Sequence, residues 1–250
     1  MNLADLSWPQ VDALDRNIPV VIPVAAVEQH GHHLPVYTDS LLCGEVIRRV
    51  SERLADRVLF APLMWLGNSH HHMDFKGTLS ASPRVYIDML HDLAEDMLAH
   101  GFKRLMFVNG HGGNIIPGQQ AIFELRQRYR DRTDLLLLFA CYWDFGEADT
   151  ERYKLMQGRV GHAGEYETSM MLKLRPDLVA DVSDLQTVEF GFGFAPAYRG
   201  WTTKDRSEPG HIGSPQLATA EKGEHLFETF SGGLAEYLEK VATWDGTTWA

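Results

Sequence analysis

The chain alternates short unbroken apolar runs with longer stretches in which apolar residues recur every three or four positions. The short runs predict buried strands, at 19–24, 57–63, 103–109 and 135–143. The longer stretches predict amphipathic helices, at 40–55, 83–100, 117–130, 167–174 and 217–240. Continuous apolar strands that alternate with helices are typical of an α/β fold, in which a largely parallel sheet lies between helix layers.

Length and composition favour one globular domain. The 250 residues contain no internal repeat and no low-complexity linker, so we expect a single domain over residues 1–250. No apolar run approaches 18 residues, so no segment is expected to span a membrane. The formal charge of −11 disfavours nucleic acid and anionic membranes as partners, because both attract clustered Lys and Arg. Two cysteines in separate apolar segments, and an N-terminus without a leader pattern, predict a cytoplasmic location.

Histidine is the unusual feature of the composition. Nine of the twelve histidines fall in predicted loops, namely His30, His32, His33, His70, His71, His72, His111, His162 and His211. The first three follow the first predicted strand, the triplet follows the second, and His111 follows the third. Ligands of such folds bind beyond the carboxyl ends of the strands, so this distribution predicts a site on one edge of the sheet.

Glu28, His30 and Asp39 lie in the loop after the first strand. Residues two apart in an extended segment point to the same side, so Glu28 and His30 are expected to face one pocket. A return of the loop could bring Asp39 to them, and carboxylates with imidazole suit zinc, manganese or iron. The alternative is that Asp39 only caps the following helix while the other two are solvated.

His111 stands in the sequence VNGHGGN, residues 108–114, where a strand ends among glycines. Its neighbour Gly112 is small enough to let a metal or a substrate approach. A glycine-rich turn with an incidental histidine is the alternative. A phosphate-binding loop fits less well, because the segment lacks the Walker lysine and the dinucleotide spacing.

His162, Glu165 and Glu167 lie in GHAGEYETS, residues 161–169, before or at the start of a helix. Acidic residues in a first helical turn are also ordinary partners of the helix dipole, which is the alternative for either glutamate. Two other chemistries fit poorly. No G-x-S-x-G nucleophile elbow occurs, and both cysteines lie in apolar patterns that do not activate a thiol.

Three motifs in this order resemble the creatininase family of metal-dependent amidohydrolases. They are EQHGHHLPVYTD, NGHGGN and HAGEYETS, and the segments GTLS and GSPQLATAEKGE add to the resemblance, which covers roughly residues 15–235. The resemblance implies a three-layer α/β/α sandwich and a site for two divalent metal ions, zinc or manganese, with iron as a further option. It also implies a homo-oligomer, often a hexamer.

The resemblance implies a set of metal ligands. Glu28, Asp39 and His111 would hold one metal, and His30 would share the other with Asp39, which bridges the two. Creatininases carry a further ligand glutamate where this chain has Gly113. The resemblance implies Glu165 as its replacement, with Glu167 as the rival.

Other positions depart from the creatininase pattern. Gly158 stands where creatininases place a tryptophan over creatinine, and His71 and Lys76 replace a glutamate and a proline of the family. These departures argue against creatinine itself as the substrate. Lys76 and the histidine triplet could instead meet an anionic substrate.

The working hypothesis is therefore a binuclear metal-dependent amidohydrolase acting on a small molecule. A hydroxide bridging the metals would attack an amide, cyclic amide or formamide carbonyl. The expected catalytic residues are His162, which would protonate the leaving nitrogen, and Glu167. Substrate contacts are expected from His32, His71, Gly112 and Trp143, with Tyr142 as an alternative wall. A hydrolase that opens a cyclic polyol ketone or a lactone, and a metal-binding protein without turnover, remain as alternatives.

Overall fold

A parallel four-stranded sheet lies at the centre of the structure, a computed structural model that describes residues 1–191 and 194–248. The strand order is β2–β1–β3–β4, and all three pairings are parallel. The strands are β1 (Pro19–Val24), β2 (Leu59–Phe60), β3 (Arg104–Asn109) and β4 (Leu136–Cys141). This arrangement confirms the predicted α/β class.

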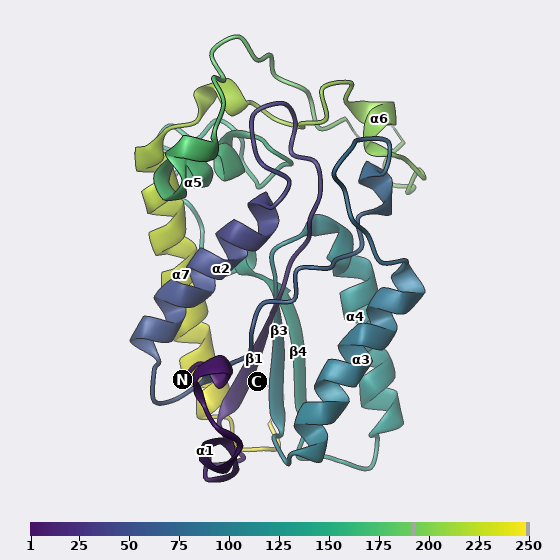
Figure 1. The fold of residues 1–250 in the computed structure, drawn as a ribbon, viewed down its shortest axis with the longest axis vertical. Helices are drawn as coiled ribbons and strands as arrows, with labels where there is room; N and C mark the ends of the chain where they lie inside the picture. Colours follow the sequence, from purple (N-terminus) through teal and green to yellow (C-terminus); the bar gives the residue numbers. More distant parts are fainter. Residues whose placement is uncertain (192–193, 249–250) are drawn as a thin grey trace.

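Helices cover both faces of the sheet, which makes the structure a three-layer sandwich (Figure 1). One layer holds α2 (Thr38–Arg53), α5 (Glu165–Leu174) and α7 (Ala220–Ala242). The other holds α3 (Pro83–Ala99) and α4 (Ile115–Arg128). The short helices α1 (Trp8–Asp12) and α6 (Thr203–Arg206) lie toward opposite ends of the molecule (Figure 1).

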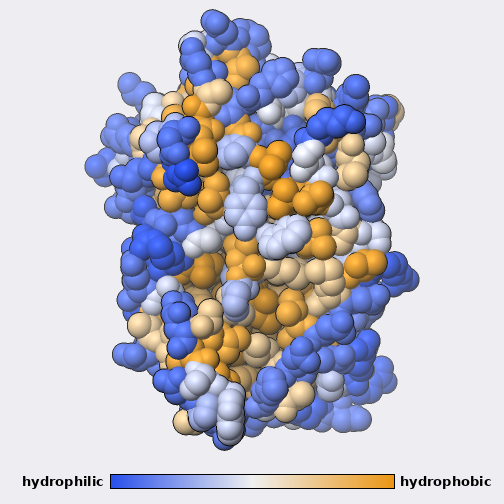
Figure 2. All heavy atoms as spheres, in the orientation of Figure 1, coloured by the Kyte–Doolittle hydropathy of each residue, from blue (hydrophilic) through white to orange (hydrophobic). Residues whose placement is uncertain are grey.

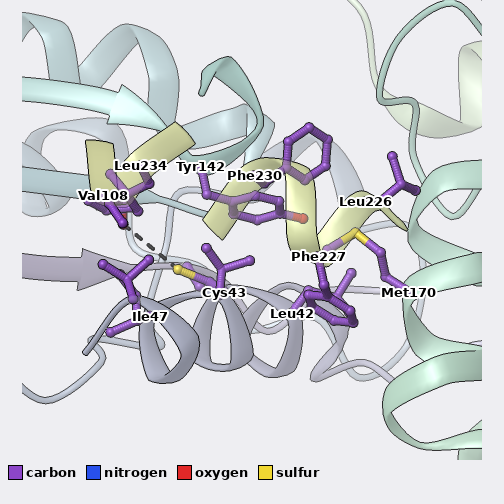
Figure 3. Packing of buried hydrophobic residues seen from close by; sticks show 14 of the residues in the cluster. Leu42, Cys43, Ile47, Val108, Tyr142, Met170, Leu226, Phe227, Phe230 and Leu234 are labelled. Atoms are coloured by element: carbon purple, nitrogen blue, oxygen red, sulfur yellow. Dashed lines mark hydrogen bonds between the residues drawn. The ribbon is translucent and has the colours of Figure 1, made fainter. Parts of the chain in front are cut away.

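Side-chain alternation along the strands builds two cores. Val21 of β1 and Met106 of β3 pack with α2, α5 and α7, whereas Val20 and Leu105, one residue earlier, pack with α3 and α4. Successive strand residues point to opposite faces, so a continuous apolar run is what two covered faces require. Figure 3 shows part of the first core, in which the Cys43 thiol contacts the carbonyl of Val108 at 3.8 Å.

The structure corrects the predicted second strand. The expectation was a strand over 57–63, but β2 covers only Leu59–Phe60. Pro62 has no N–H to continue the ladder, and on the outer side Phe60 donates to the backbone of Met1 instead of to another strand. The remaining predicted elements are present, with ends that differ by at most three residues.

The outer faces of the helices are mainly hydrophilic, while apolar side chains gather toward the middle of the face shown in Figure 2. This distribution follows from amphipathic helices that bury one stripe and hydrate the other. None of the helices in the described residues is long and apolar enough to cross a membrane.

Candidate metal centre

Three strands deliver their following loops to one level of the sheet. Val24, Asn109 and Cys141 are paired in register across β1, β3 and β4, and each is the last residue of its strand. The loop after β1 carries Glu28 and His30, and the loop after β3 carries His111. These side chains therefore meet at the edge of the sheet where the histidine pattern predicted a site.

Asp39 stands between two histidines. Its Oδ1 atom is 2.9 Å from Nε2 of His30, and its Oδ2 atom is 2.9 Å from Nδ1 of His111. All three side chains are buried. Asp39 is not the helix cap of the alternative interpretation, because α2 begins at Thr38 and its N-cap residue makes no side-chain cap. The carboxylate is instead free to serve both histidines.

Gly110 allows α2 to approach the loop after β3. A Cβ atom at this position would lie 2.6 Å from Cβ of Cys43 and 3.2 Å from the carbonyl oxygen of Asp39. Any larger residue would push the first turn of α2 away from the loop. The glycine before His111 is thus part of what brings His111 next to Asp39.

The two histidines present lone pairs to the carboxylates. Nδ1 of His30 is 3.0 Å from the carbonyl oxygen of Glu28, and Nε2 of His111 is 3.1 Å from that of Asn68. A carbonyl oxygen only accepts, so each contact places the ring proton on that nitrogen. In the neutral form of each ring, the other nitrogen carries no proton, and this nitrogen faces Asp39. Such a carbonyl behind the ring is the usual second contact of a metal-ligating histidine.

Two carboxylate oxygens in the cluster lack a hydrogen-bond partner. They are Oδ2 of Asp39 and Oε2 of Glu28, which lies 3.2 Å from Nδ1 of His111. Ligand atoms about 2.0–2.2 Å from a zinc ion can be no more than about 4.4 Å apart, so these separations suit a common ion. The donor set and the unpartnered oxygens therefore fit divalent metal ions.

The cluster also has the electrostatics of a cation site. Within the described residues, the ion-pair partners of Glu28, Asp39 and Glu167 are histidines only. Burial opposes a charge on His30, but Asp39 and the other carboxylates outweigh it and raise the pKa of His30 to about 10. Burial likewise opposes a charge on His111, yet Glu28 and Asp39 hold its pKa well above the usual value. Buried carboxylates in this number require positive charge beside them.

Glu167, from the first turn of α5, faces the cluster. Its Oε2 atom is 3.9 Å from Nε2 of His30 and accepts a hydrogen bond of 2.5 Å from the N–H of Ala163. Ala163 has a φ of 50°, which alanine rarely adopts, and this conformation aims its N–H at the carboxylate. Burial raises the pKa of Glu167 to about 7.

The structure does not bring Glu165 to the cluster, contrary to the ligand set that the resemblance implied. Its Oε1 atom is 2.6 Å from Nζ of Lys222, and its Oε2 atom accepts hydrogen bonds from the N–H groups of Met156 and Gln157. Residues two apart on a helix point about 200° apart, so Glu165 and Glu167 cannot both face the same site.

His162 and His72 lie on the other side of Glu28. Oε1 of Glu28 is 3.4 Å from Nδ1 of His162 and 3.3 Å from Nε2 of His72. The remaining ring nitrogens are 2.9 and 2.8 Å from the side-chain amide nitrogen of Gln29. The same amide nitrogen donates a hydrogen bond of 2.9 Å to the carbonyl oxygen of Gly210, so its second hydrogen can serve one of the two rings at a time.

A cavity of about 630 Å³ opens onto the cluster. Besides Glu28, Asp39, His111 and Glu167 of the cluster, four further residues expected at the site line it, namely His71, Gly112, Trp143 and His162. His71 also packs its ring parallel to that of His111, with centroids 5.7 Å apart. Tyr142, the alternative wall, is buried in the core instead.

His32 does not line the cavity, contrary to expectation. The chain turns at Gly31, with a φ of 65°, and the turn leaves His32 exposed while His33 is buried. Nε2 of His33 is 3.0 Å from Oγ1 of Thr168. His32, the residue expected to contact the substrate, is therefore the exposed member of the pair.

Several residues of the site gave no sequence signal. Gln29 lies between Glu28 and His30, and no pattern in the sequence pointed to a role for it. The cavity is also lined by side chains from a segment without a recognisable motif, among them Phe190, Arg199, Trp201 and Arg206. Gly113 has no room for the glutamate of creatininases, because a Cβ there would lie 2.2 Å from the carbonyl oxygen of Asn68.

Fold and site together define a class of protein. A parallel α/β sheet flanked by helices carries, at one edge, a buried cluster of carboxylates and imidazoles suited to metal ions. A family model described as creatininase, creatinine amidohydrolase, matches residues 4–238. The chain belongs to the creatininase family, and it is a hydrolase of that family.

Curated relatives match nearly the full chain. Creatinine amidohydrolase of Pseudomonas putida is 31% identical, over 95% of this chain and 96% of its own. Mycofactocin precursor peptide peptidase of Mycobacterium tuberculosis is 30% identical, over 90% and 85%. The 3-dehydro-scyllo-inosose hydrolase of Thermotoga maritima is 26% identical, over 89% and 76%.

Solved structures show the same fold. A glutamate-to-glutamine variant of creatininase complexed with creatine has a TM-score of 0.80 at 30% identity, and the match covers 97% of this chain and 99% of that one. A Zn–Zn form and a Mn form of creatininase match with TM-scores of 0.78 and 0.77, also at 30% identity. Each match covers 96% of this chain and 97% of the other.

Proposed function

We propose that the protein is a binuclear metal-dependent amidohydrolase that cleaves a C–N bond in an amide, a cyclic amide or a formamide. The observation that carries the proposal is Asp39, whose two oxygens each lie 2.9 Å from a ring nitrogen of a different histidine. A carboxylate placed in this way can bridge two cations. The related creatininase structures in Zn–Zn and Mn forms support these metals.

Two ligand groups follow from the distances. Glu28, Asp39 and His111 would hold one metal, and His30, Asp39 and Glu167 the other. Glu167 thus takes the place that the resemblance gave to Glu165. When bound, such metals lower the pKa of water toward neutrality and polarise a carbonyl oxygen.

The protein's own residues would then manage the proton and the substrate. When the Gln29 amide donates to Nε2 of His162, the ring proton of the neutral imidazole lies on Nδ1, toward Glu28. His162 also lines the cavity, so it can carry a proton between an attacking water and a leaving nitrogen. His71 and Trp143 would bound the substrate on two sides, and Gly112 would leave room for it.

The test is a hydrolysis screen with metal-loaded protein, covering formamides, cyclic amides such as creatinine, short peptides, a lactone and a cyclic polyol ketone. We expect turnover of an amide, loss of that turnover with a chelator, and recovery with Zn²⁺ or Mn²⁺. His162→Gln should keep its metal and lose about 100-fold or more in kcat.

Other outcomes would redirect the assignment. Turnover of the ketone or lactone without any amide would contradict C–N cleavage and favour the ring-opening relative as a guide. Tight metal binding without turnover of any compound would favour a metal-binding protein. The expected homo-oligomer is also a proposal, and light scattering of the purified protein would test it.

A further inference from the structure

Three arginines line the cavity above the metal centre. They are Arg159, from the loop before His162, and Arg199 and Arg206, from the segment that ends in α6. The guanidinium of Arg159 lies 4.4 Å from the ring centroid of Phe190. These cations come from distant parts of a chain whose net charge is −11, so their convergence on one cavity is not a consequence of composition.

Aromatic rings hold the arginines at the cavity wall. Arg206 lies 4.7 Å from the ring centroid of Trp201 and donates a hydrogen bond to the carbonyl of Phe190. Phe190 and Trp201 line the same cavity. A guanidinium has five N–H donors, so stacking on a ring is compatible with a further contact to a planar or tetrahedral anion.

Arg159 and Arg206 lie close enough for their positive charges to interact. Burial lowers the pKa of Arg206, and the neighbouring charge of Arg159 lowers it further. The charge of Arg206 also reaches His71, whose ring stacks on that of His111. Arg206 therefore lies close to Arg159 and to the ring of His71, which packs on the metal cluster.

Carboxylates of the cavity are confined to the metal centre. Those that line it in the described residues are Glu28, Asp39 and Glu167. A second cavity, of about 530 Å³, shares Arg199 and Arg206 with the first but also contains Glu189 and Asp205. The wall that faces the metal centre, formed by Phe190, Trp201 and the arginines, thus carries positive charge.

We propose that Arg159, Arg199 and Arg206 bind an anionic group, a carboxylate or a phosphate, on the substrate whose amide lies at the metal centre. This inference rests on the proposed function and names the substrate class of the same site. A cavity of about 630 Å³ holds a small molecule with room for both groups. Lys76, the cation considered from the sequence, is exposed and does not line the cavity.

Calorimetric titration of the metal-loaded protein with phenyl phosphate, benzoate and the neutral benzyl alcohol tests the proposal. Arg159→Gln and Arg206→Gln should each weaken binding of at least one anion by about tenfold or more, as expected for a lost charge-assisted hydrogen bond. Benzyl alcohol binding should not change. The two anions show whether the site prefers carboxylate or phosphate.

Controls separate recognition from misfolding and from binding to the metals. Arg130 is an exposed arginine that follows α4 and donates a hydrogen bond to the carbonyl of Gln127. Arg130→Gln should leave the anion affinities unchanged. Arg206 also supports the segment at Phe190, so Arg199→Gln, whose guanidinium lies over the ring of Phe194, serves as the second variant. Each variant should retain the metal content of the wild type.

Two results would overturn the inference. One is an anion affinity within twofold of wild type in all three cavity variants, because the metals alone would then hold the anion. The other is wild-type protein that binds neither anion. Failure of the proposed function looks different, since arginine-dependent anion binding would persist in a protein that hydrolyses no amide.

Discussion

Glu165 and Glu167 lie two residues apart in the first turn of α5, but their side chains point in different directions and contact different partners. Glu165 is fully buried against Lys222, and Glu167 faces His30 and Asp39. The first glutamate stabilises the junction of α5 with α7, whereas the second belongs to the metal cluster. We therefore expect a substitution of Glu165 to affect folding stability and a substitution of Glu167 to affect metal binding.

Glu167→Gln should lower the affinity for one of the two metals by about tenfold or more while the protein stays folded, because it removes a negative ligand. Glu165→Gln should keep both metals but lower the free energy of unfolding by about 3 kcal/mol, since it leaves Lys222 without its buried partner. Metal analysis and urea unfolding of both variants measure the difference. Loss of metal in Glu165→Gln alone would reverse the assignment.

His33 gives the fold a sensitivity to acid. Burial, the nearby charge of His211 and that of His30 lower its pKa to about 4, and its Nδ1 atom has no hydrogen-bond partner. The unfolded chain takes up this proton below about pH 6.5, whereas the folded protein resists until about pH 4. The unfolded state thus binds more protons in this window, and stability falls as the pH is lowered through it.

Comparison of wild type with His33→Gln isolates this effect, because the groups that both proteins share titrate in both. Between pH 7 and pH 5, the wild type should lose up to about 2 kcal/mol more unfolding free energy than the variant. Urea unfolding at the two pH values provides the measurement. Equal losses in the two proteins would show that His33 does not contribute.

At the scale of elements, α5 is placed by its contact with α7. Gly223, in the first turn of α7, lies against the backbone of α5, and a Cβ there would be 2.0 Å from the carbonyl oxygen of Ser169. Gly232 lies further along the same helix, where a Cβ would meet only the end of the Arg53 side chain, at 3.4 Å. The close contact at Gly223 fixes the helix that carries Glu167.

Gly223→Ala should therefore lower the free energy of unfolding by about 2 kcal/mol or more, because the backbones must separate. Gly232→Ala should be neutral or stabilise by up to about 1 kcal/mol, since alanine has the higher helix propensity and an open position. Thermal or urea unfolding of both variants checks the contrast. A Gly223→Ala protein as stable as Gly232→Ala would mean that the helices are not packed as described.

Hydrophobic periodicity was sufficient to predict the main elements, because both cores impose it along the chain. β1 was predicted with its observed ends, and α3 to within one residue. The failures have local causes. Pro62 shortens β2, and α2 begins at Thr38 because the turn before it, not a side-chain cap at Asp39, sets its start.

The site was predictable only where a motif ties chemistry to a strand end. Glu28, His30, Asp39 and His111 follow that rule, and the structure brings them together. Helix phase, which decides between Glu165 and Glu167, depends on a starting residue that no local signal fixes. The arginines of the cavity come from segments whose positions depend on tertiary contacts, so periodicity carries no information about them.

At the scale of the whole molecule, the sheet acts as a scaffold that presents one buried cluster at the carboxyl ends of its strands. Asp39 is the central residue of that cluster, because it is the only described carboxylate with one oxygen toward each of His30 and His111. Metal binding to the folded protein should depend on it more than on any single histidine. Asp39→Asn keeps the shape of the side chain and removes its charge.

The most direct test is elemental analysis of wild type and Asp39→Asn after loading with Zn²⁺ and removal of excess metal by gel filtration. We expect about two zinc ions per chain in the wild type and fewer than about one in the variant, with circular dichroism showing that both are folded. Wild-type protein that retains no zinc, or an Asp39→Asn variant that retains as much as the wild type, would contradict the binuclear site.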